Sequence, residues 1–206
     1  MTKCKKKYMS LFIETIQVFQ GNLLNLAYHQ ERFERTRVEA LGLKHHPRLS
    51  EVILVPKGLE HGVFKCRVSY HKEISLVEYE RYQARAVRSL KMVYSDSIDY
   101  GFKYSDRGEL NKLFSQRQEC DDIVVVKNGY VSDSFVANVV FWDGAFWVTP
   151  DTPLLAGTMR ASLLARDLIR ESKIIPEDID KFRKLKLINA MNDLQNAPDI
   201  PIESIH

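Results

Sequence analysis

The sequence predicts an α+β fold made of two lobes, because the pattern changes partway along its 206 residues. The first half reads as one strand, one helix and two further strands, which is enough for a small sheet with a helix on one face. The second half contains several short strands, two helices and hairpin turns between strands. We therefore expect a small N-terminal α+β lobe over residues 1–86 and a larger C-terminal lobe over residues 87–206, connected through residues 83–88.

Residue spacing predicts the elements of the N-terminal lobe. Residues 11–19 alternate and are rich in β-branched side chains, as in a strand, and Gly21-Asn22 is a turn signal. From Asn25 to about Leu41 the apolar residues recur at helical spacing, and Gly42 stands where a helix would end. Two more strands are expected, over residues 62–70 and 74–82.

Turn signals contribute as much as apolar runs to the prediction for the C-terminal lobe. Asn128-Gly129 and Asp143-Gly144 suit tight hairpins, because these residue pairs tolerate the positive φ angles that such turns require. Helices are expected from about Asp106 to Gln118 and from Gly157-Thr158 to about Glu171. The expected strands cover residues 90–94, 122–126, 138–142, 145–149 and 186–189.

Composition excludes several classes of protein. The net charge of +3 is small, and no aromatic-basic stripe follows the basic cluster between Lys3 and Lys7, so we expect no nucleic-acid partner. No run approaches the roughly 20 apolar residues of a membrane helix. Cys4, Cys66 and Cys120 lack the spacing of metal ligands, and their odd number fits no complete disulfide framework. These features indicate a cytoplasmic protein without a metal site or a membrane partner.

One segment has the form of an anion-binding site. In Leu154-Leu155-Ala156-Gly157-Thr158-Met159-Arg160 a glycine directly precedes a predicted helix. The first N–H groups of a helix have no partner within it, and the helix dipole places partial positive charge at the same end. Such a helix start suits a phosphate group, although most turns of this kind only begin a helix.

Five motifs, taken in order, resemble the fold-type IV (class IV) enzymes that depend on pyridoxal 5'-phosphate (PLP). This family includes branched-chain and D-amino acid aminotransferases and 4-amino-4-deoxychorismate lyase. The motifs are Phe12-Ile13-Glu14-Thr15-Ile16, His29-Gln30-Glu31-Arg32-Phe33, Tyr100-Gly101-Phe102-Lys103-Tyr104-Ser105-Asp106-Arg107, Asp133-Ser134-Phe135-Val136-Ala137-Asn138 and the segment from Leu154 to Arg160. With an end near Asn189-Ala190-Met191, the resemblance covers nearly the whole chain. It implies the two-lobed fold of that family, with a β-barrel-like C-terminal lobe, and a homodimer.

The resemblance also implies a role for each matching residue. Lys103 stands at the Schiff-base lysine, which condenses with the cofactor aldehyde and later moves a substrate proton. Asp133 stands where many members have glutamate, and a carboxylate there keeps the pyridine nitrogen protonated. Arg32 would bind the phosphate through its guanidinium fork. The backbone N–H groups expected at the phosphate are those of Val136, Thr158 and Met159.

The chain departs from the family pattern in three places. It begins almost at the first strand, Phe135 replaces a common Ser or Thr, and Met159 replaces a common threonine. The change at Met159 removes a side-chain contact with the phosphate but keeps the amide. If the roles are right, the lobes should meet at a cleft lined by Lys103, Asp133 and Gly157, with Arg32 near the helix start at Thr158.

The C-terminal motif favours one reaction over another. Class IV aminotransferases tend to carry a Gly-Thr-Ala loop that receives the substrate carboxylate, whereas the lyases tend to carry an asparagine-containing segment that Leu187-Ile188-Asn189-Ala190-Met191 resembles. The resemblance thus implies a lyase that converts 4-amino-4-deoxychorismate to 4-aminobenzoate, a folate precursor, and pyruvate. An aminotransferase for a branched-chain or D-amino acid is the alternative. A non-catalytic binding protein that kept the fold is the third reading, supported by the short N-terminal lobe and Phe135.

Overall fold

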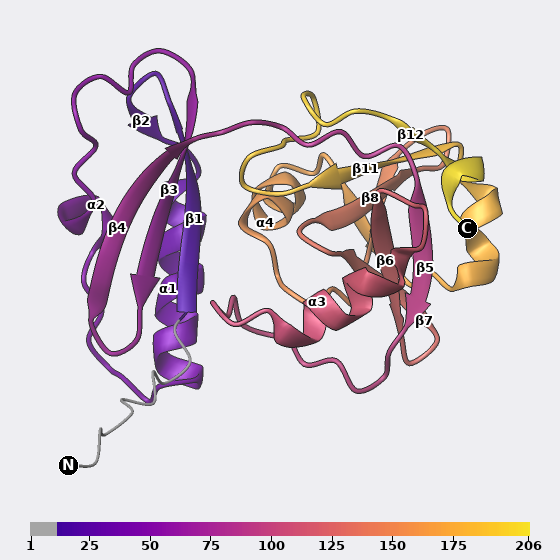
Figure 1. Cartoon of the computed structure of the whole chain (residues 1–206), viewed down its shortest axis with the longest axis horizontal. Coiled ribbons are helices and arrows are strands. Elements are labelled where there is room, and N and C mark those ends of the chain that lie inside the picture. Colours follow the sequence, from indigo (N-terminus) through magenta and orange to yellow (C-terminus); the bar gives the residue numbers. More distant parts are fainter. Residues whose placement is uncertain (1–11) are drawn as a thin grey trace.

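The computed structural model describes residues 12–206 and contains two sheets that lie side by side, each with its own hydrophobic core (Figure 1). The first sheet is antiparallel, in the order β2-β1-β3-β4. Its strands are β1 (Phe12–Phe19), β2 (Asn22–Leu23), β3 (Val63–Tyr70) and β4 (Ile74–Arg81). The basic cluster between Lys3 and Lys7, Cys4 and the first residue of the expected first strand, Leu11, lie outside the described residues.

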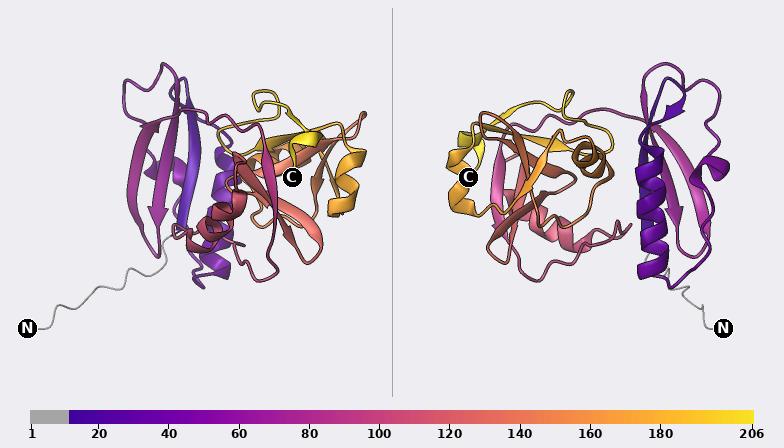
Figure 2. Two further views of the ribbon diagram at one scale, coloured as in Figure 1. Left: turned by 45° about the vertical axis from the view of Figure 1, so that its right-hand side comes forward. Right: turned by 180° about the vertical axis from the view of Figure 1, so that it is seen from behind.

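One face of the first sheet is covered by helix α1 (Leu26–Glu39), which the view from behind shows in front of the strands (Figure 2). Phe33 of α1 is fully buried against Ile16 of β1 and Tyr70 of β3. A second, four-residue helix, α2 (Leu49–Val52), follows α1 and buries Leu49 in the same core. Side chains alternate along a strand, so the residues next to these core positions in β1 and β3 point to the face of the sheet that α1 does not cover.

The second sheet is mixed, in the order β10-β9-β8-β7-β6-β5, and β11 pairs antiparallel along the whole length of β8. Its strands are β5 (Leu90–Tyr94), β6 (Asp122–Lys127), β7 (Tyr130–Ser134), β8 (Asn138–Trp142), β9 (Trp147–Pro150), β10 (Arg170–Ser172), β11 (Lys184–Ile188) and β12 (Ile200–Pro201). The helices of this half are α3 (Gly108–Phe114), α4 (Thr158–Ala165) and three short 3-10 helices, at Ser115–Arg117, Pro176–Lys181 and Ile202–Ser204. The architecture is α+β, as the sequence predicts. Within residues 12–206 no helix has the length and apolar character that crossing a bilayer requires.

The two sheets are joined by residues 82–89, the segment that contains the expected lobe boundary, and they also touch directly. The N–H of Ile13 on β1 donates a hydrogen bond of 2.9 Å to the carbonyl of Lys103, and Phe12 forms a bridge with Tyr104. The Phe12 ring also lies 5.3 Å from the ring of Tyr104, centroid to centroid. The loop that carries Lys103 is therefore fixed against the edge of the first sheet.

Two helix predictions were too long, and helix α2 and strands β2, β7, β10 and β12 were not predicted. The helix that begins at Thr158 ends at Ala165 rather than near Glu171, because Asp167 adopts a left-handed conformation (φ 53°) and residues 170–172 pair in parallel with β9. Helix α3 begins at Gly108 and gives way to a 3-10 turn before Gln118, whose φ is also positive. Among the strands that were not predicted, β7 is the one that carries Asp133.

Candidate active site

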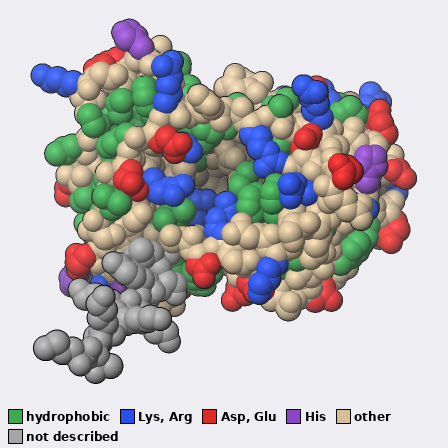
Figure 3. All heavy atoms as spheres, viewed as in Figure 1, with side chains coloured by type: hydrophobic (Ala, Val, Ile, Leu, Met, Phe, Trp, Pro, Cys, Tyr) green, Lys and Arg blue, Asp and Glu red, His purple; other side chains and the backbone are tan. Residues whose placement is uncertain are grey.

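A cavity of about 370 Å³ lies between the two halves of the molecule. In the space-filling view it is a hollow in which Lys and Arg side chains gather (Figure 3). The first half contributes Arg32 of α1 and residues from the face of β1 and β3 that α1 does not cover, including Thr15 and Arg67. The connecting segment and the second half contribute the rest. Of the residues singled out from sequence, Arg32, Lys103, Asp133, Val136, Gly157 and Thr158 all line this cavity.

Lys103 is half-buried in the loop between β5 and α3, where its backbone is held by Ile13. Burial of the amine lowers its pKa, and the positive charges of Arg32, Arg107 and Arg67 lower it further, to about 7, although Glu14 opposes this shift. An ordinary lysine is protonated at neutral pH, whereas about half of the Lys103 amines would be neutral there. The neutral amine has the free electron pair that a nucleophile or a base needs.

Among the described residues that line the cavity, Asp133 has the only carboxylate, and it is almost completely buried. Its Oδ1 accepts a hydrogen bond of 2.8 Å from the side-chain amide of Asn138, and its Oδ2 accepts one of 2.9 Å from the backbone N–H of Leu155. Burial raises the pKa of Asp133 to about 6, while these two hydrogen bonds act in the opposite direction. A carboxylate can accept further hydrogen bonds, so Asp133 keeps the capacity to bind a protonated ring nitrogen.

The start of α4 is closely fitted around Gly157. A Cβ atom at this position would lie 2.0 Å from Oδ1 of Asn138, so no larger residue fits unless Asn138 moves. Asn138 also donates a hydrogen bond of 2.9 Å to the carbonyl of Leu155. The absence of a side chain at Gly157 therefore allows the carboxylate of Asp133 and the N-terminus of α4 to share one wall of the cavity.

Arg32 belongs to a buried network that links the first half of the molecule to the start of α4. Its Nε and a terminal nitrogen donate to the two oxygens of Glu14, at 2.9 and 2.6 Å. Glu14 also pairs with Nδ1 of His29 at 2.6 Å, and Nε2 of His29 lies 3.3 Å from the hydroxyl of Thr158. Burial alone would raise the pKa of Glu14, but the charge of Arg32 and the hydrogen bonds from His29 and Arg32 lower it to about 2. The carboxylate is therefore ionised, and it orients Arg32 at the edge of the cavity.

Glu14 and His29 were not singled out from the sequence, although both lie in motifs that carry the family resemblance. Burial lowers the pKa of His29, although its hydrogen bond to Glu14 works against this. The ring is therefore neutral, and it connects Glu14 to Thr158. A glutamate inside an apolar strand was the local signal for such a network, because a buried carboxylate requires partners.

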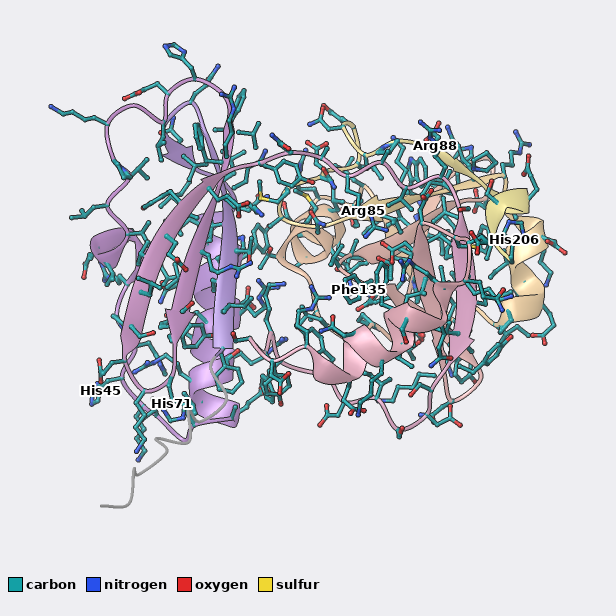
Figure 4. All side chains as sticks on the ribbon, viewed as in Figure 1. His45, His71, Arg85, Arg88, Phe135 and His206 are labelled. Carbon is teal, nitrogen blue, oxygen red and sulfur yellow. The ribbon has the colours of Figure 1, made fainter. Side chains whose placement is uncertain are left out.

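Three of the residues singled out from the sequence remain to be placed: Met159, Val136 and Phe135. Met159 does not line the cavity, since its side chain packs in the core with Val140 and Leu163, and only its backbone N–H is available at the start of α4. Val136 is half-exposed on the loop opposite α4. Phe135 lies at the cavity in the middle of the molecule, stacked on Phe114 with ring centres 4.1 Å apart (Figure 4).

These features together fit a phosphate-bearing aldehyde such as PLP. A helix start with free N–H groups and a buried arginine suit the phosphate, and an amine with a lowered pKa suits the aldehyde. The buried carboxylate of Asp133 suits a ring nitrogen on the same wall. The residues present are therefore chemically matched to the cofactor that the resemblance implies.

Comparisons with known proteins agree with the sequence motifs. Residues 11–200 match the family described as "Amino-transferase class IV". An uncharacterised protein of Haemophilus influenzae is 41% identical over 183 residues, which cover 88% of this chain and 97% of the relative.

Among solved structures, a protein of Haemophilus somnus 129pt, provisionally named a 4-amino-4-deoxychorismate lyase, is 36% identical with a TM-score of 0.86. The match covers 91% of this chain and 99% of that one. A hypothetical aminotransferase of Mycobacterium tuberculosis in a PLP-bound form has the same fold, with a TM-score of 0.74 at 16% identity over 95% of this chain and 81% of that one. The chain described here therefore belongs to the class IV aminotransferase family of PLP-dependent aminotransferases and lyases.

Proposed function

We propose that this protein is a PLP-dependent lyase that converts 4-amino-4-deoxychorismate to 4-aminobenzoate and pyruvate, a step toward folate. The observation that carries the proposal is the amine of Lys103, with its pKa near 7, in a cavity that it shares with Asp133 and the start of α4. The name of the structural relative from Haemophilus somnus supports the lyase reaction. So does the position of Asn189, Ala190 and Met191, which line the same cavity.

In this proposal the cofactor is bound at both ends by the chain's own residues. Nζ of Lys103 would form the covalent bond to it, and Arg32 together with the N–H groups of Thr158 and Met159 would bind the phosphate. The N–H of Val136 contributes from the opposite loop. Asp133 holds the proton on the pyridine nitrogen.

When bound, PLP withdraws electrons from the carbon that carries the substrate amine. The free amine of Lys103 would accept the proton from this ring carbon at Nζ. The bond between the ring and the enolpyruvyl oxygen then breaks, and the remaining ring becomes aromatic. Lys103 returns a proton to the methylene carbon of the departing enol, which gives pyruvate. A pKa near 7 allows the same amine to act first as a base and then as an acid.

The experiment is product analysis by chromatography after incubation of the PLP-loaded protein with 4-amino-4-deoxychorismate. We expect equal amounts of 4-aminobenzoate and pyruvate, and no turnover for Lys103→Ala. Borohydride reduction of the loaded protein should attach the cofactor to Lys103. The matched control is Lys112→Ala, since Lys112 is exposed on α3 and pairs with Glu109 on the surface. Label on Lys112 instead of Lys103 would show that the motif was misaligned.

The second candidate is an aminotransferase with the same cofactor site, which the name of the Mycobacterium tuberculosis structure favours. It predicts transfer of an amino group from a branched-chain or D-amino acid to a keto acid, with no release of pyruvate from 4-amino-4-deoxychorismate. Separate incubations with the two sets of substrates distinguish the reactions. A protein that binds no PLP and turns over neither set would be the non-catalytic binding protein.

Two further properties belong to the proposal. The family resemblance supports a two-fold homodimer, which light scattering of the purified protein would measure. We also place the protein in a reducing cytoplasm, where cysteines such as Cys66 and Cys120 stay as thiols.

A further inference from the structure

The cavity contains more positive charge than the cofactor phosphate requires. Among the described residues that line it, six side chains are cationic, against the single carboxylate of Asp133: Arg32, Lys65, Arg67, Arg85, Lys103 and Arg107. Arg32 is neutralised by Glu14, and Lys65 by Glu80 at 2.9 Å. Within residues 12–206, Arg67, Arg85 and Arg107 form no ion pair. Charges in a partly desolvated site require counter-ions, so an anionic substrate would complete this site.

Arg107 is held in place on the wall formed by the second half of the molecule. Its guanidinium carbon lies 4.1 Å from the ring centre of Phe135, and it donates a hydrogen bond to the carbonyl of the same residue. Its Nε is buried and has no hydrogen-bond partner in the described part of the chain. Burial lowers the pKa of Arg107, because its guanidinium group is already partly desolvated. A fixed and desolvated guanidinium loses little entropy when a carboxylate binds to it.

Arg67 lies on the opposite wall. It pairs with Thr15 across strands β3 and β1, and its exposed side chain lies on the cavity face of that sheet. Its positive charge lowers the pKa of both Lys103 and Arg107, after the larger effect of burial in each case. Arg67 therefore lines the same cavity as the reacting amine, but it belongs to the other half of the molecule.

We propose that Arg67 and Arg107 each bind one carboxylate of a substrate that carries two, and that this pair sets the specificity of the cavity. The inference rests on the proposed function, because the substrate of that lyase carries one carboxylate on its ring and another on its enolpyruvyl group. An amino acid with an apolar side chain has only one carboxylate, so it leaves one of the two guanidinium groups without a counter-ion. The pair thus selects a dicarboxylate that spans the cavity from wall to wall.

The test uses three unreactive probes and isothermal titration calorimetry of the PLP-loaded protein. The probe 3-(carboxymethoxy)benzoate carries both carboxylates on an aromatic ring, whereas benzoate and phenoxyacetate each carry one of them. We expect the dicarboxylate to bind about tenfold or more tightly than either monocarboxylate, because it forms a second charge-assisted hydrogen bond to a guanidinium group. Arg67→Met and Arg107→Met should each weaken the dicarboxylate by about tenfold or more, and each should leave a different monocarboxylate unaffected.

Two further variants serve as controls. Arg88→Met removes an exposed arginine near Arg85 in sequence but away from the hollow (Figure 4), and it should leave all three affinities unchanged. Arg107→Lys keeps the positive charge beside Phe135 but cannot form the bidentate hydrogen bonds that a guanidinium group makes with a carboxylate. The affinity of this variant for the dicarboxylate should therefore lie between those of the wild type and Arg107→Met.

The inference is overturned if the dicarboxylate binds no more tightly than the monocarboxylates, or if each arginine variant weakens all three probes equally. Either result with normal lyase turnover would leave the proposed function intact. Conversely, the expected affinities in a protein that binds PLP but releases no pyruvate from 4-amino-4-deoxychorismate would overturn the lyase and retain the two arginines as carboxylate-binding residues.

Discussion

Replacement of Glu14 by glutamine should destabilise the protein and displace Arg32. The pKa of Glu14 falls from 4.5 to about 2 in the folded protein, which corresponds to roughly 3 kcal/mol in favour of the ionised form. Removal of one partner from a buried ion pair typically costs a similar roughly 3–5 kcal/mol. The amide of glutamine also presents a donor where Arg32 and His29 need an acceptor. We therefore expect the free energy of unfolding to fall by about 3 kcal/mol at neutral pH.

The pH dependence gives this prediction a second readout. Because the pKa of Glu14 is lowered by folding, its stabilisation is complete above pH 4.5 and is lost as the pH falls through about 2. The difference in the free energy of unfolding between wild type and Glu14→Gln should thus stay constant from neutral pH to about pH 5 and become smaller below that. Urea unfolding followed by circular dichroism measures both effects. Glu31→Gln, an exposed glutamate on the same helix as Arg32, is the matched control.

The reasoning about Glu14 fails if Glu14→Gln unfolds within about 0.5 kcal/mol of the wild type, the range of ordinary surface substitutions. It also fails if the difference between the two proteins is the same at all values of pH. In either case the network would not stabilise the fold, and the orientation of Arg32 would not depend on Glu14.

Four other changes test the cofactor site. Gly157→Ala places a Cβ atom against Asn138 and should lower PLP affinity about tenfold or more in an absorbance titration, unless Asn138 moves without loss of its bond to Asp133. Arg32→Ala should weaken PLP binding, and an unchanged titration would make Arg32 a structural residue only. Asp133→Asn should retain PLP but slow turnover about a hundredfold or more in a steady-state assay, since an amide cannot keep the ring nitrogen protonated; full activity would contradict this role. In the wild-type apoprotein the rate of Schiff-base formation with added PLP should rise with pH up to about 7 and level off above it, as the free amine of Lys103 loses its proton; a rate that keeps rising toward about pH 10 would contradict the lowered pKa.

Features that depend on residues close in sequence were predicted without the structure. Strands β1, β3 and β4 and helix α1 of the first lobe follow from apolar spacing. The observed ends of β1 and α1 lie within two residues of the expected ones at their described ends. The motif order alone indicated the family, and it pointed to Lys103, Asp133 and the Gly157 helix start. These residues lie in one cavity because that family's fold brings their loops together.

Strand β7 shows why a local pattern is not always sufficient. Its segment Ser132-Asp133-Ser134 is polar and reads as a turn, yet all three residues are buried. The hydroxyl of Ser132 donates to the carbonyl of Thr152 at 2.6 Å, and Asp133 is satisfied by Asn138 and Leu155. Partners that are distant in sequence satisfy these polar groups, so the strand is stable only in the folded molecule.

The sequence by itself determined the fold class of the protein and its family, and it predicted the residues that would hold a cofactor. Only the tertiary structure showed that Glu14 orients Arg32 and connects through His29 to Thr158. Only the structure placed Arg67 and Arg107 on opposite walls of one cavity. The physical reason is that spacing along the chain records which face of an element is apolar, whereas charge pairing and desolvation depend on which elements meet in space.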